Sequence, residues 1–404
     1  MKTPVVPTCV KRLLAGCVMA LAVLNGTVAV AAPACGAADW PLWSDFRTHF
    51  IQDSGRVLDA STAMSHSSSE GQSYGMFFAL VAGDRPTFDR LWDWAVNNLG
   101  GGDLSQRLPA WIWGKAQDGT WRVIDDNSAS DANLWFVYAL LEAGRLWQEP
   151  AYTRRALDML ALVESQEVAD LPGLGYMLLP GRDWFSRPSE RAWQLNASYL
   201  PLPVLRRLAN ERPQGPWGDI AENTAIMTEA TAPHGFAPDW TRYQAKNNPP
   251  SFVVDTIKGP VGSYDAIRTY LWAGMTPSSD PLFSRMLHAL DGMVGATRSG
   301  NGVPPESVNT QTGEFTGRGP FGFSAALIPY FKAKGQELLF EQQKPWVRAM
   351  LHQSTSSTAA AGQPPYYDYV LSLFGIGWLD GLFRFRADGT LYLSWENECV
   401  VTTK

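Results

Sequence analysis

Three acidic residues of this chain lie in settings that suit acid–base chemistry. Glu70 lies among small residues, in the run Ser-Ser-Ser-Glu-Gly-Gln-Ser at the start of an apolar stretch, and Asp131 and Asp265 each follow a long polar segment. Cleavage of a glycosidic bond requires two carboxyls on opposite sides of that bond. One protonates the leaving oxygen, and the other acts at the anomeric carbon, directly or through water. The three acids are therefore candidates for such a reaction.

Each acid also has a purely structural interpretation. Ser67 and Glu70 have the spacing of a helix capping box. Asp131, or the serine before it, could cap a helix that begins there, and Asp265 could do the same for a later helix. Arg268 would then form an ion pair with Asp265 on the helix surface. On the local sequence alone, both interpretations stay open.

Apolar residues recur at helical spacing along most of the chain, which predicts about twelve helices. Their expected ranges are 40–52, 70–83, 86–99, 130–148, 150–167, 196–210, 216–230, 263–273, 279–297, 320–333, 336–352 and 365–382.

The connections between these helices alternate between short and long. The long ones occupy 53–69, 100–129, 168–195, 231–262 and 298–319. Short links join antiparallel neighbours, so the pattern predicts a toroid of helical hairpins whose long loops gather on one face. Each acid follows a long loop, and the three helix N-termini would therefore meet on that face.

Strand signals are confined to the long connections and the C-terminal part. Small hairpins are predicted within 174–181 and 302–317, and a clearer one around the Asp-Gly pair of 384–393. Residues 354–362 are rich in Ala and Ser and are predicted to form a polar surface loop. We find no repeat and no linker, and expect one catalytic domain over 32–404.

The first 31 residues have the features of an export signal. A basic start precedes an apolar segment that ends in Ala-Val-Ala, a suitable cleavage site. The alternative is a membrane anchor, but the small residues at its end favour cleavage, without stable membrane insertion afterwards. We therefore expect a periplasmic or secreted protein. In an oxidising compartment Cys35 and Cys399 could form a disulfide, the alternative being two free thiols.

Composition narrows the classes of partner. The net charge is −6, and removal of the basic leader makes the remainder more acidic, which argues against nucleic acid and anionic membranes. Only five His are present and no Cys/His cluster has zinc spacing, so neither a metal nor another cofactor is expected. Most of the 17 Trp residues are expected in the core, but several lie in Gly/Pro-rich connections, where flat rings beside polar groups suit sugars.

Several segments together resemble glycoside hydrolase family 8. They are 69–76, 108–115, 127–131, 140–147, 263–268, 322–326 and 366–371, and they span nearly the whole mature chain. The resemblance implies an all-α fold, the (α/α)6 barrel, and an inverting endo-β-1,4-glucanase. It is greatest to the periplasmic members encoded with bacterial cellulose synthase. A β-1,4-glucan chain would be the substrate, a synthase or export complex a further partner, and a monomer the expected state.

The resemblance also implies roles for individual residues. Glu70 would be the general acid and Asp265 the general base. Asp131 would hold and distort the sugar in the subsite before the cut. Tyr264 and Arg268 flank the base and would position water and substrate.

Four further aromatic residues match family positions. Trp111, Trp113, Tyr366 and Tyr369 would stack on or contact the substrate, with burial in the core as the alternative for each.

Two positions depart from the family pattern. The family has a second acid two residues after Asp131, where this chain has Asn133, so the role of that second acid is in doubt. The family's Asn-Pro-Ser-Tyr run is Asn-Ala-Ser-Tyr at 196–199, and losing the proline loosens the turn. If Asp265 were not the base, Asp239 would be the next candidate. The alternative for Asp239, and the commoner role of an aspartate in such a setting, is to cap a loop.

Two other functions remain as alternatives. A non-catalytic glucan-binding or scaffold component of an exopolysaccharide secretion system would share the aromatic groove, but the three intact acids argue against it. A helical-toroid polysaccharide lyase would need a basic groove or a Tyr/His/Arg set, which an acidic chain with few His does not favour.

The inverting mechanism of the leading hypothesis predicts roughly 6.5–9.5 Å between the two catalytic carboxyls.

Overall fold

The computed structural model describes residues 38–62, 64–246, 248–357 and 362–396. The predicted leader, its cleavage site, Cys35 and Cys399 lie outside these ranges. Within them, no helix combines the length and the apolar character needed to cross a membrane.

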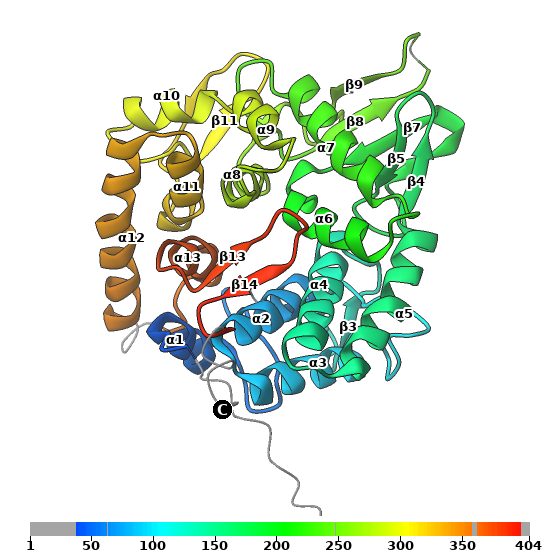
Figure 1. The fold of residues 1–404 in the computed structure, drawn as a ribbon, viewed down its shortest axis with the longest axis vertical. Helices are drawn as coiled ribbons and strands as arrows, with labels where there is room; N and C mark the ends of the chain where they lie inside the picture. Colours follow the sequence, from blue (N-terminus) through cyan, green and yellow to red (C-terminus); the bar gives the residue numbers. More distant parts are fainter. Residues whose placement is uncertain (1–37, 63, 247, 358–361, 397–404) are drawn as a thin grey trace, which may run out of the picture. The chain divides into compact units, whose positions relative to one another are not determined.

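The helices that pack against one another around the centre form an inner ring, which can be followed in Figure 1. They are α2 (Ser69–Ala82), α4 (Ser130–Leu146), α6 (Leu202–Glu211), α8 (Ala266–Met275), α11 (Phe321–Ala333) and α13 (Tyr366–Leu379). Each packs against the next in this order. The ring closes where Tyr74 and Phe77 of α2 meet Phe374 of α13, with ring centroids 5.3 and 5.4 Å apart.

The remaining helices lie outside this ring and pair with it as hairpins. They are α1 (Pro41–Phe50), α3 (Arg85–Asn98), α5 (Pro150–Gln166), α7 (Trp217–Thr231), α9 (Phe283–Ala289), α10 (Gly292–Ser299) and α12 (Glu337–Ser357). The outer helices are amphipathic: in α5 the buried residues Tyr152, Ala156, Leu160 and Val163 recur every three or four positions. The predicted double ring of helical hairpins, an (α/α)6 barrel, is confirmed.

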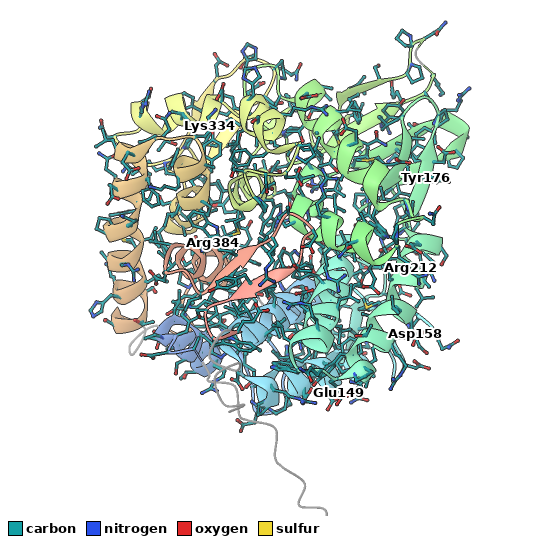
Figure 2. All side chains as sticks on the ribbon, in the orientation of Figure 1. Glu149, Asp158, Tyr176, Arg212, Lys334 and Arg384 are labelled. Atoms are coloured by element: carbon teal, nitrogen blue, oxygen red, sulfur yellow. The ribbon has the colours of Figure 1, made fainter. Side chains whose placement is uncertain are left out.

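The inner helices are buried almost all round, because they face both the outer ring and the centre. All residues of α2 except Glu70 are buried. Side chains fill the space between the helices (Figure 2). At the centre, Trp135 of α4 contacts Phe77, Trp272 and Phe374, with centroids 4.9 to 5.4 Å apart. These rings hold α2, α4, α8 and α13 at fixed distances from one another.

Local sequence sets the tight turns between hairpin helices. Gly83 ends α2 in the left-handed region, at φ 72°. Asp84 then caps α3 by accepting a hydrogen bond from the Thr87 N–H at 3.1 Å, and Pro86 follows in the first turn. Such a two-residue link forces α3 to run antiparallel to α2.

All twelve predicted helices exist, but the predicted boundaries or continuity of three of them were wrong. The segment 279–297 is broken at Leu290 and Asp291 into α9 and α10, because the Gly292 N–H binds the Gly235 carbonyl instead of continuing the helix. The segment 196–210 becomes helical only at Leu202, after a 3₁₀ turn, since Pro201 disfavours helix in the residue before it. Residues 354–357, predicted as loop, extend α12.

Two predicted hairpins are confirmed. They are β13 (Phe383–Phe385) with β14 (Leu391–Leu393), and β11 (Ser307–Asn309) with β12 (Phe315–Thr316). The third prediction has the wrong partner, because β5 (Gly175–Leu178) pairs with the preceding β4 (Val168–Leu171).

Other strands were not predicted. β1 (Ser67–Ser68), β2 (Ile112–Lys115) and β3 (Trp121–Asp125) form one sheet, and β10 (Val261–Gly262) joins β11. β6 (Ser186–Arg187), β7 (Ala192–Leu195), β8 (Thr241–Gln244) and β9 (Ser251–Val254) form another sheet. These small sheets shape the loops from which the inner helices start.

Candidate active site

The three predicted acids come together at the N-terminal ends of three inner helices. Glu70 and Asp131 lie in the first turns of α2 and α4, and Asp265 immediately precedes α8. Arg268, one turn into α8, connects them: its Nη2 lies 3.1 Å from Asp265 Oδ1 and 3.7 Å from Asp131 Oδ2. The positive charge of Arg268 also acts on the Glu70 carboxyl.

Glu70 is not a capping residue. The hydroxyl of Ser68 caps α2 by accepting a hydrogen bond from the Gly71 N–H at 3.1 Å, so the capping-box interpretation is wrong. The Glu70 carboxyl instead accepts hydrogen bonds from Trp111 Nε1 at 2.9 Å and from Ser69 Oγ at 3.2 Å. Burial raises the pKa of Glu70, and these two hydrogen bonds reduce that rise. A carboxyl with a raised pKa retains its proton for transfer.

Asp131 is buried and does not cap α4 either. Its side chain is 2% exposed, the helix begins after Ala129, and no side chain caps it. Oδ1 accepts a hydrogen bond from the adjacent Ala132 N–H at 2.9 Å, whereas Oδ2 has no hydrogen-bond partner in the described part of the chain. Burial, followed by the negative charge of Glu70, raises the pKa of Asp131 well above its usual range. Oδ2 is thus a buried acceptor whose hydrogen-bonding capacity is unused within the described ranges.

Asp265 is held by two donors. Trp240 Nε1 donates to Oδ2 at 3.0 Å, and Arg268 Nη2 donates to Oδ1 at 3.1 Å. Glu70 and Asp265 therefore each accept a hydrogen bond from a separate indole. The predicted ion pair with Arg268 exists, but the Arg268 side chain is only 12% exposed, so the pair is not on the helix surface as predicted.

Asp239 takes the capping role at the start of α8. Its Oδ1 accepts hydrogen bonds from the backbone N–H groups of Ser263, Asp265 and Ala266 at 2.7, 3.1 and 2.8 Å. The interpretation of Asp239 as a capping residue is therefore confirmed. Because it binds the backbone around Asp265, it sets the direction in which that carboxyl points.

Three residues around Arg268 were not predicted to belong to the site. Arg268 donates to Ser198 Oγ at 3.1 Å and to the Tyr367 hydroxyl at 3.3 Å, and lies 5.8 Å from the Tyr199 ring. Ser198 and Tyr199 belong to the Asn-Ala-Ser-Tyr run, and Tyr367 lies beside the predicted Tyr366. Trp240 was also missed, and its place next to Asp239 was the only signal for it.

Two predicted contact residues are exposed beside the acids. Trp111 is 41% exposed and Tyr264 is 46% exposed, and the Tyr264 hydroxyl donates to Glu306 Oε1 at 3.0 Å. Tyr366 is half-buried against Phe50, with ring centroids 5.6 Å apart.

The other two predicted contact residues are packed. Trp113 lies between Trp94 and Trp121, with ring centroids 5.5 and 5.3 Å away, and the guanidinium of Arg56 lies 4.6 Å from its ring. Tyr369 has no exposed surface, so it is a core residue in this structure and not a contact residue as predicted.

The two departures from the family pattern have local explanations. Asn133 is fully buried and donates to both carboxyl oxygens of Glu167, each at 3.0 Å. Asn196 Oδ1 accepts hydrogen bonds from the Ser198 N–H at 3.0 Å and the Ser198 hydroxyl at 2.7 Å, which maintains the 3₁₀ turn without a proline.

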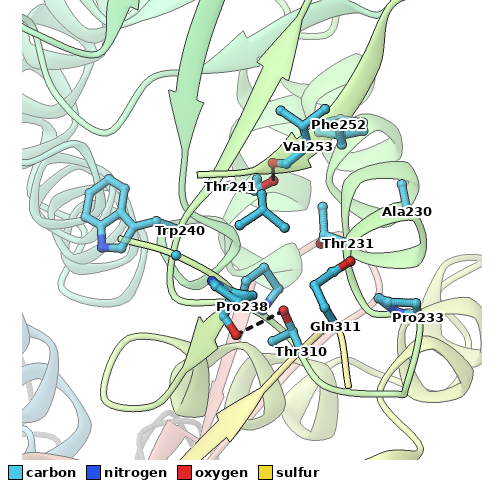
Figure 3. Close-up of a pocket in the computed structure, with 13 residues that line it drawn as sticks. Ala230, Thr231, Pro233, Pro238, Trp240, Thr241, Phe252, Val253, Thr310 and Gln311 are labelled. Carbon is cyan, nitrogen blue, oxygen red and sulfur yellow. Dashed lines mark hydrogen bonds between the residues drawn. The ribbon is translucent and has the colours of Figure 1, made fainter. Parts of the chain in front are cut away.

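A separate pocket lies behind the segment that carries Asp239 and Trp240 (Figure 3). Its volume is about 200 Å³, and it is lined mainly by Thr, Pro and Val residues together with Phe252 and Gln311. Figure 3 shows the Trp240 ring extending away from the other lining side chains. None of the three acids lines this pocket.

Within the described ranges, no group of His, Cys, Asp and Glu could hold a metal ion.

A double ring of helical hairpins that brings acidic side chains together at inner-helix N-termini has the groups that acid–base cleavage of a glycosidic bond requires. A family model described as glycosyl hydrolases family 8 matches residues 16–381. The chain belongs to this family.

This chain is similar to individual relatives over most of their length. The chain is 48% identical over 392 residues to a protein named endoglucanase from Pseudomonas fluorescens (strain SBW25), covering 95% of this chain and 98% of the relative. It is 43% identical over 363 residues to the Escherichia coli (strain K12) endoglucanase, with 90% and 93% covered. The crystal structure of an endo-1,4-D-glucanase from Vibrio fischeri ES114 superposes with a TM-score of 0.81 at 36% identity, covering 88% of this chain and 99% of that one.

Proposed function

We propose that this protein hydrolyses internal β-1,4-glucosidic bonds of a cellulose-type glucan with inversion at the anomeric carbon. The observation that carries the proposal is the placement of Glu70 and Asp265 at the starts of two inner helices, each bound by its own indole N–H, with Arg268 close to the acids. Relatives named endoglucanase support the choice of substrate.

Glu70 serves as the general acid in this proposal. Its pKa is raised by burial, so the carboxyl holds a proton near neutral pH more readily than an exposed glutamate does. That proton passes to the glycosidic oxygen as the bond between this oxygen and the anomeric carbon breaks. The Trp111 N–H, 2.9 Å from Oε1, then stabilises the carboxylate that is left.

Asp265 serves as the general base. It takes a proton from a water molecule whose oxygen forms the new bond to the anomeric carbon, on the face opposite the leaving group. Arg268 and Trp240 fix both oxygens of its carboxyl, which limits the directions in which it can accept the proton. Attack from the opposite face converts a β-linkage into an α-anomer.

Asp131 binds the sugar in the subsite before the cut. Its unpartnered Oδ2 is buried beside Arg268 and accepts a hydrogen bond from a sugar hydroxyl. An acceptor that is unsatisfied in the free protein gains a full hydrogen bond when a sugar arrives. The exposed rings of Trp111 and Tyr264 offer flat faces for neighbouring glucose units.

We further propose that residues 32–404 form the catalytic domain, exported by the leader and active as a monomer in the periplasm or outside the cell. An association with bacterial cellulose synthesis and a synthase or export complex remains part of this proposal. The relatives named above include no synthase component, so this part rests on the resemblance.

The test is hydrolysis of soluble carboxymethyl-cellulose by the wild type and by Glu70→Gln, with the anomer of fresh product read by NMR. The wild type is expected to release α-anomer. The amide of the variant donates no proton, so its kcat is expected to fall at least about 100-fold while binding is retained.

The matched control is Glu341→Gln on the outer face of α12, which is exposed and distant in sequence from the site. It should keep wild-type activity. Hydrolysis at a wild-type rate by Glu70→Gln would remove Glu70 as the acid. Fresh β-anomer would exclude inversion, and a folded but inactive wild type that still binds glucan would favour a scaffold.

A further inference from the structure

A further buried carboxyl, that of Glu167, binds residues on both sides of Asp131 in the chain. Glu167 follows the last residue of α5 and is fully buried. Its carboxyl accepts a hydrogen bond from Ser128 Oγ and two from Asn133 Nδ2, the latter at 3.0 Å each. None of these three residues contributes to the proposed mechanism.

We propose that Glu167 is a positioning residue that holds Asp131 in its working place by binding the chain on both sides of it. The inference rests on the proposed function, because Asp131 is the group whose placement would matter. Glu167 itself does not reach the substrate in this proposal.

The two partners of Glu167 flank Asp131 in sequence. Ser128 lies three residues before it, in the turn that leads into α4, and Asn133 lies two residues after it, in the first turn of the helix. A single carboxyl therefore ties the turn to the helix start. The backbone that carries Asp131 cannot shift unless one of these buried hydrogen bonds breaks.

A neighbouring loop holds the same turn from the other side. Ser128 Oγ accepts a hydrogen bond from the Arg182 N–H at 3.0 Å, and the Ser130 N–H donates to the Pro180 carbonyl at 2.9 Å. Gly181 lies so close that a Cβ there would be 2.2 Å from the Ser128 carbonyl oxygen. Glu167 and the loop 180–182 thus clamp the turn between them.

Asp131 depends on this clamp because its own side chain has few partners. Apart from Arg268 at 3.7 Å, it has one hydrogen bond, to the N–H of the next residue. Its place is therefore set by its backbone. A displacement of about 1 Å at a catalytic site can lower the rate about 100-fold.

Asn133 and Glu167 also match each other chemically. The amide nitrogen of Asn133 donates to both oxygens of Glu167. An aspartate at 133, where the family pattern has a second acid, would place two carboxyls in contact and force them to share a proton. Burial raises the pKa of Glu167 to about 7, while Ser128, Asn133 and the charge of Arg182 limit the rise.

The experiment exchanges the carboxyl at position 167 and the amide at position 133. For each variant, kcat and KM are measured with soluble glucan, and the melting temperature is measured on the protein alone. Glu167→Gln and Asn133→Asp should each lower kcat roughly tenfold and leave KM within about twofold, because Asp131 is displaced while remote sugar contacts persist. The double variant Glu167→Gln/Asn133→Asp restores an amide–carboxylate pair and should recover kcat to within about threefold of the wild type.

A double-mutant cycle with Asp131→Asn separates positioning from simple stability. If Glu167 acts through Asp131, Glu167→Gln should change kcat/KM much less in the Asp131→Asn background than in the wild type. The control is Glu142→Gln, which changes a fully buried glutamate at the other end of α4. This variant should have a lower melting temperature, but its kcat, measured at a temperature where it is folded, should equal that of the wild type.

Three results would overturn the positioning role in an active enzyme: unchanged kcat in Glu167→Gln, no recovery in the double variant, or an equal loss in the Asp131→Asn background. A folded wild type without glucanase activity would overturn the proposed function, and the positioning role with it.

Discussion

At the scale of single residues, the two proposed catalytic carboxyls differ in what surrounds them. Glu70 accepts hydrogen bonds from neutral donors, an indole and a hydroxyl, and its pKa is raised by burial. Asp265 accepts from an indole and from the charged Arg268. Burial favours the protonated form of Glu70 more than its neutral donors and the charge of Arg268 oppose it, whereas a direct hydrogen bond from Arg268 compensates the charge of Asp265. This difference supports the assignment of Glu70 as acid and Asp265 as base.

Replacing Trp111 by Phe should therefore move the alkaline limb of the pH profile of kcat/KM. The Trp111 hydrogen bond lowers the pKa of Glu70, so its loss raises that pKa further. An acid is inactivated as the pH rises through its pKa, and the alkaline limb should move to higher pH. The measurement is kcat/KM from about pH 4 to pH 9.

Trp121→Phe is the matched control, because Trp121 lies in β3, which pairs with the strand that follows Trp111, and is likewise exposed but stacks on Trp113 instead of binding Glu70. Its profile should coincide with that of the wild type. A shift of the Trp111→Phe limb to lower pH would show that Glu70 is not the acid that sets it.

At the scale of elements, the site depends on how closely the inner helices approach one another. α8 carries Arg268 and packs on α11 through Gly274. A Cβ at Gly274 would lie 2.2 Å from the backbone nitrogen of Tyr330 and 2.5 Å from the carbonyl carbon of Pro329. Only a residue without a side chain permits this contact between two backbones.

Gly274→Ala should therefore destabilise the protein although alanine favours helix. Separating α8 from α11 should cost about 1–3 kcal/mol of the free energy of unfolding, measured by denaturant titration. Gly295→Ala is the control, since Gly295 lies in α10 with no atom within 4 Å of its would-be Cβ. It should stabilise by about 0.5–1 kcal/mol. Equal stabilisation by both variants would contradict the close packing.

At the scale of the whole molecule, folding buries carboxyls and thereby raises their pKa values. The pKa of Glu167 rises from 4.5 to about 7 and that of Asp368 from 3.8 to about 6, in both cases chiefly through burial. The folded protein binds these protons more tightly than the unfolded chain does. Stability from these groups is therefore fully present below their unfolded pKa values of 3.8 and 4.5, and it is lost as the pH rises through about 6 and about 7.

Melting temperatures measured from pH 5 to pH 8 should show this fall, and Glu167→Gln should show less of it. The amide does not titrate, so the cost of ionising a buried carboxyl at position 167 disappears. Glu341→Gln, on the surface, should keep the wild-type slope. A steeper decline in Glu167→Gln than in the wild type would contradict the raised pKa of Glu167.

Much of this protein could be predicted from the sequence because the relevant physics is local. Periodic apolar residues determine helices, Gly83 and Asp84 determine a tight turn, and alternating residues around Asp388 and Gly389 determine a hairpin. The regular alternation of short and long connections then determines the double ring. The three acids could be found because each follows a long loop at a helix start, and helix starts in a ring converge.

The tertiary structure decided which groups serve each acid, because these groups come from distant segments. Trp240 binds Asp265 across 25 positions, Asp239 caps α8 from outside the helix, and Glu167 reaches Asn133 across 34. Local spacing carries no signal for such contacts. The sequence by itself determined the helices, their order and the acids, whose signals lie within a few residues. Only packing decided that Tyr369 is core and that Ser68, not Ser67, caps α2, because burial and hydrogen-bond geometry depend on the complete fold.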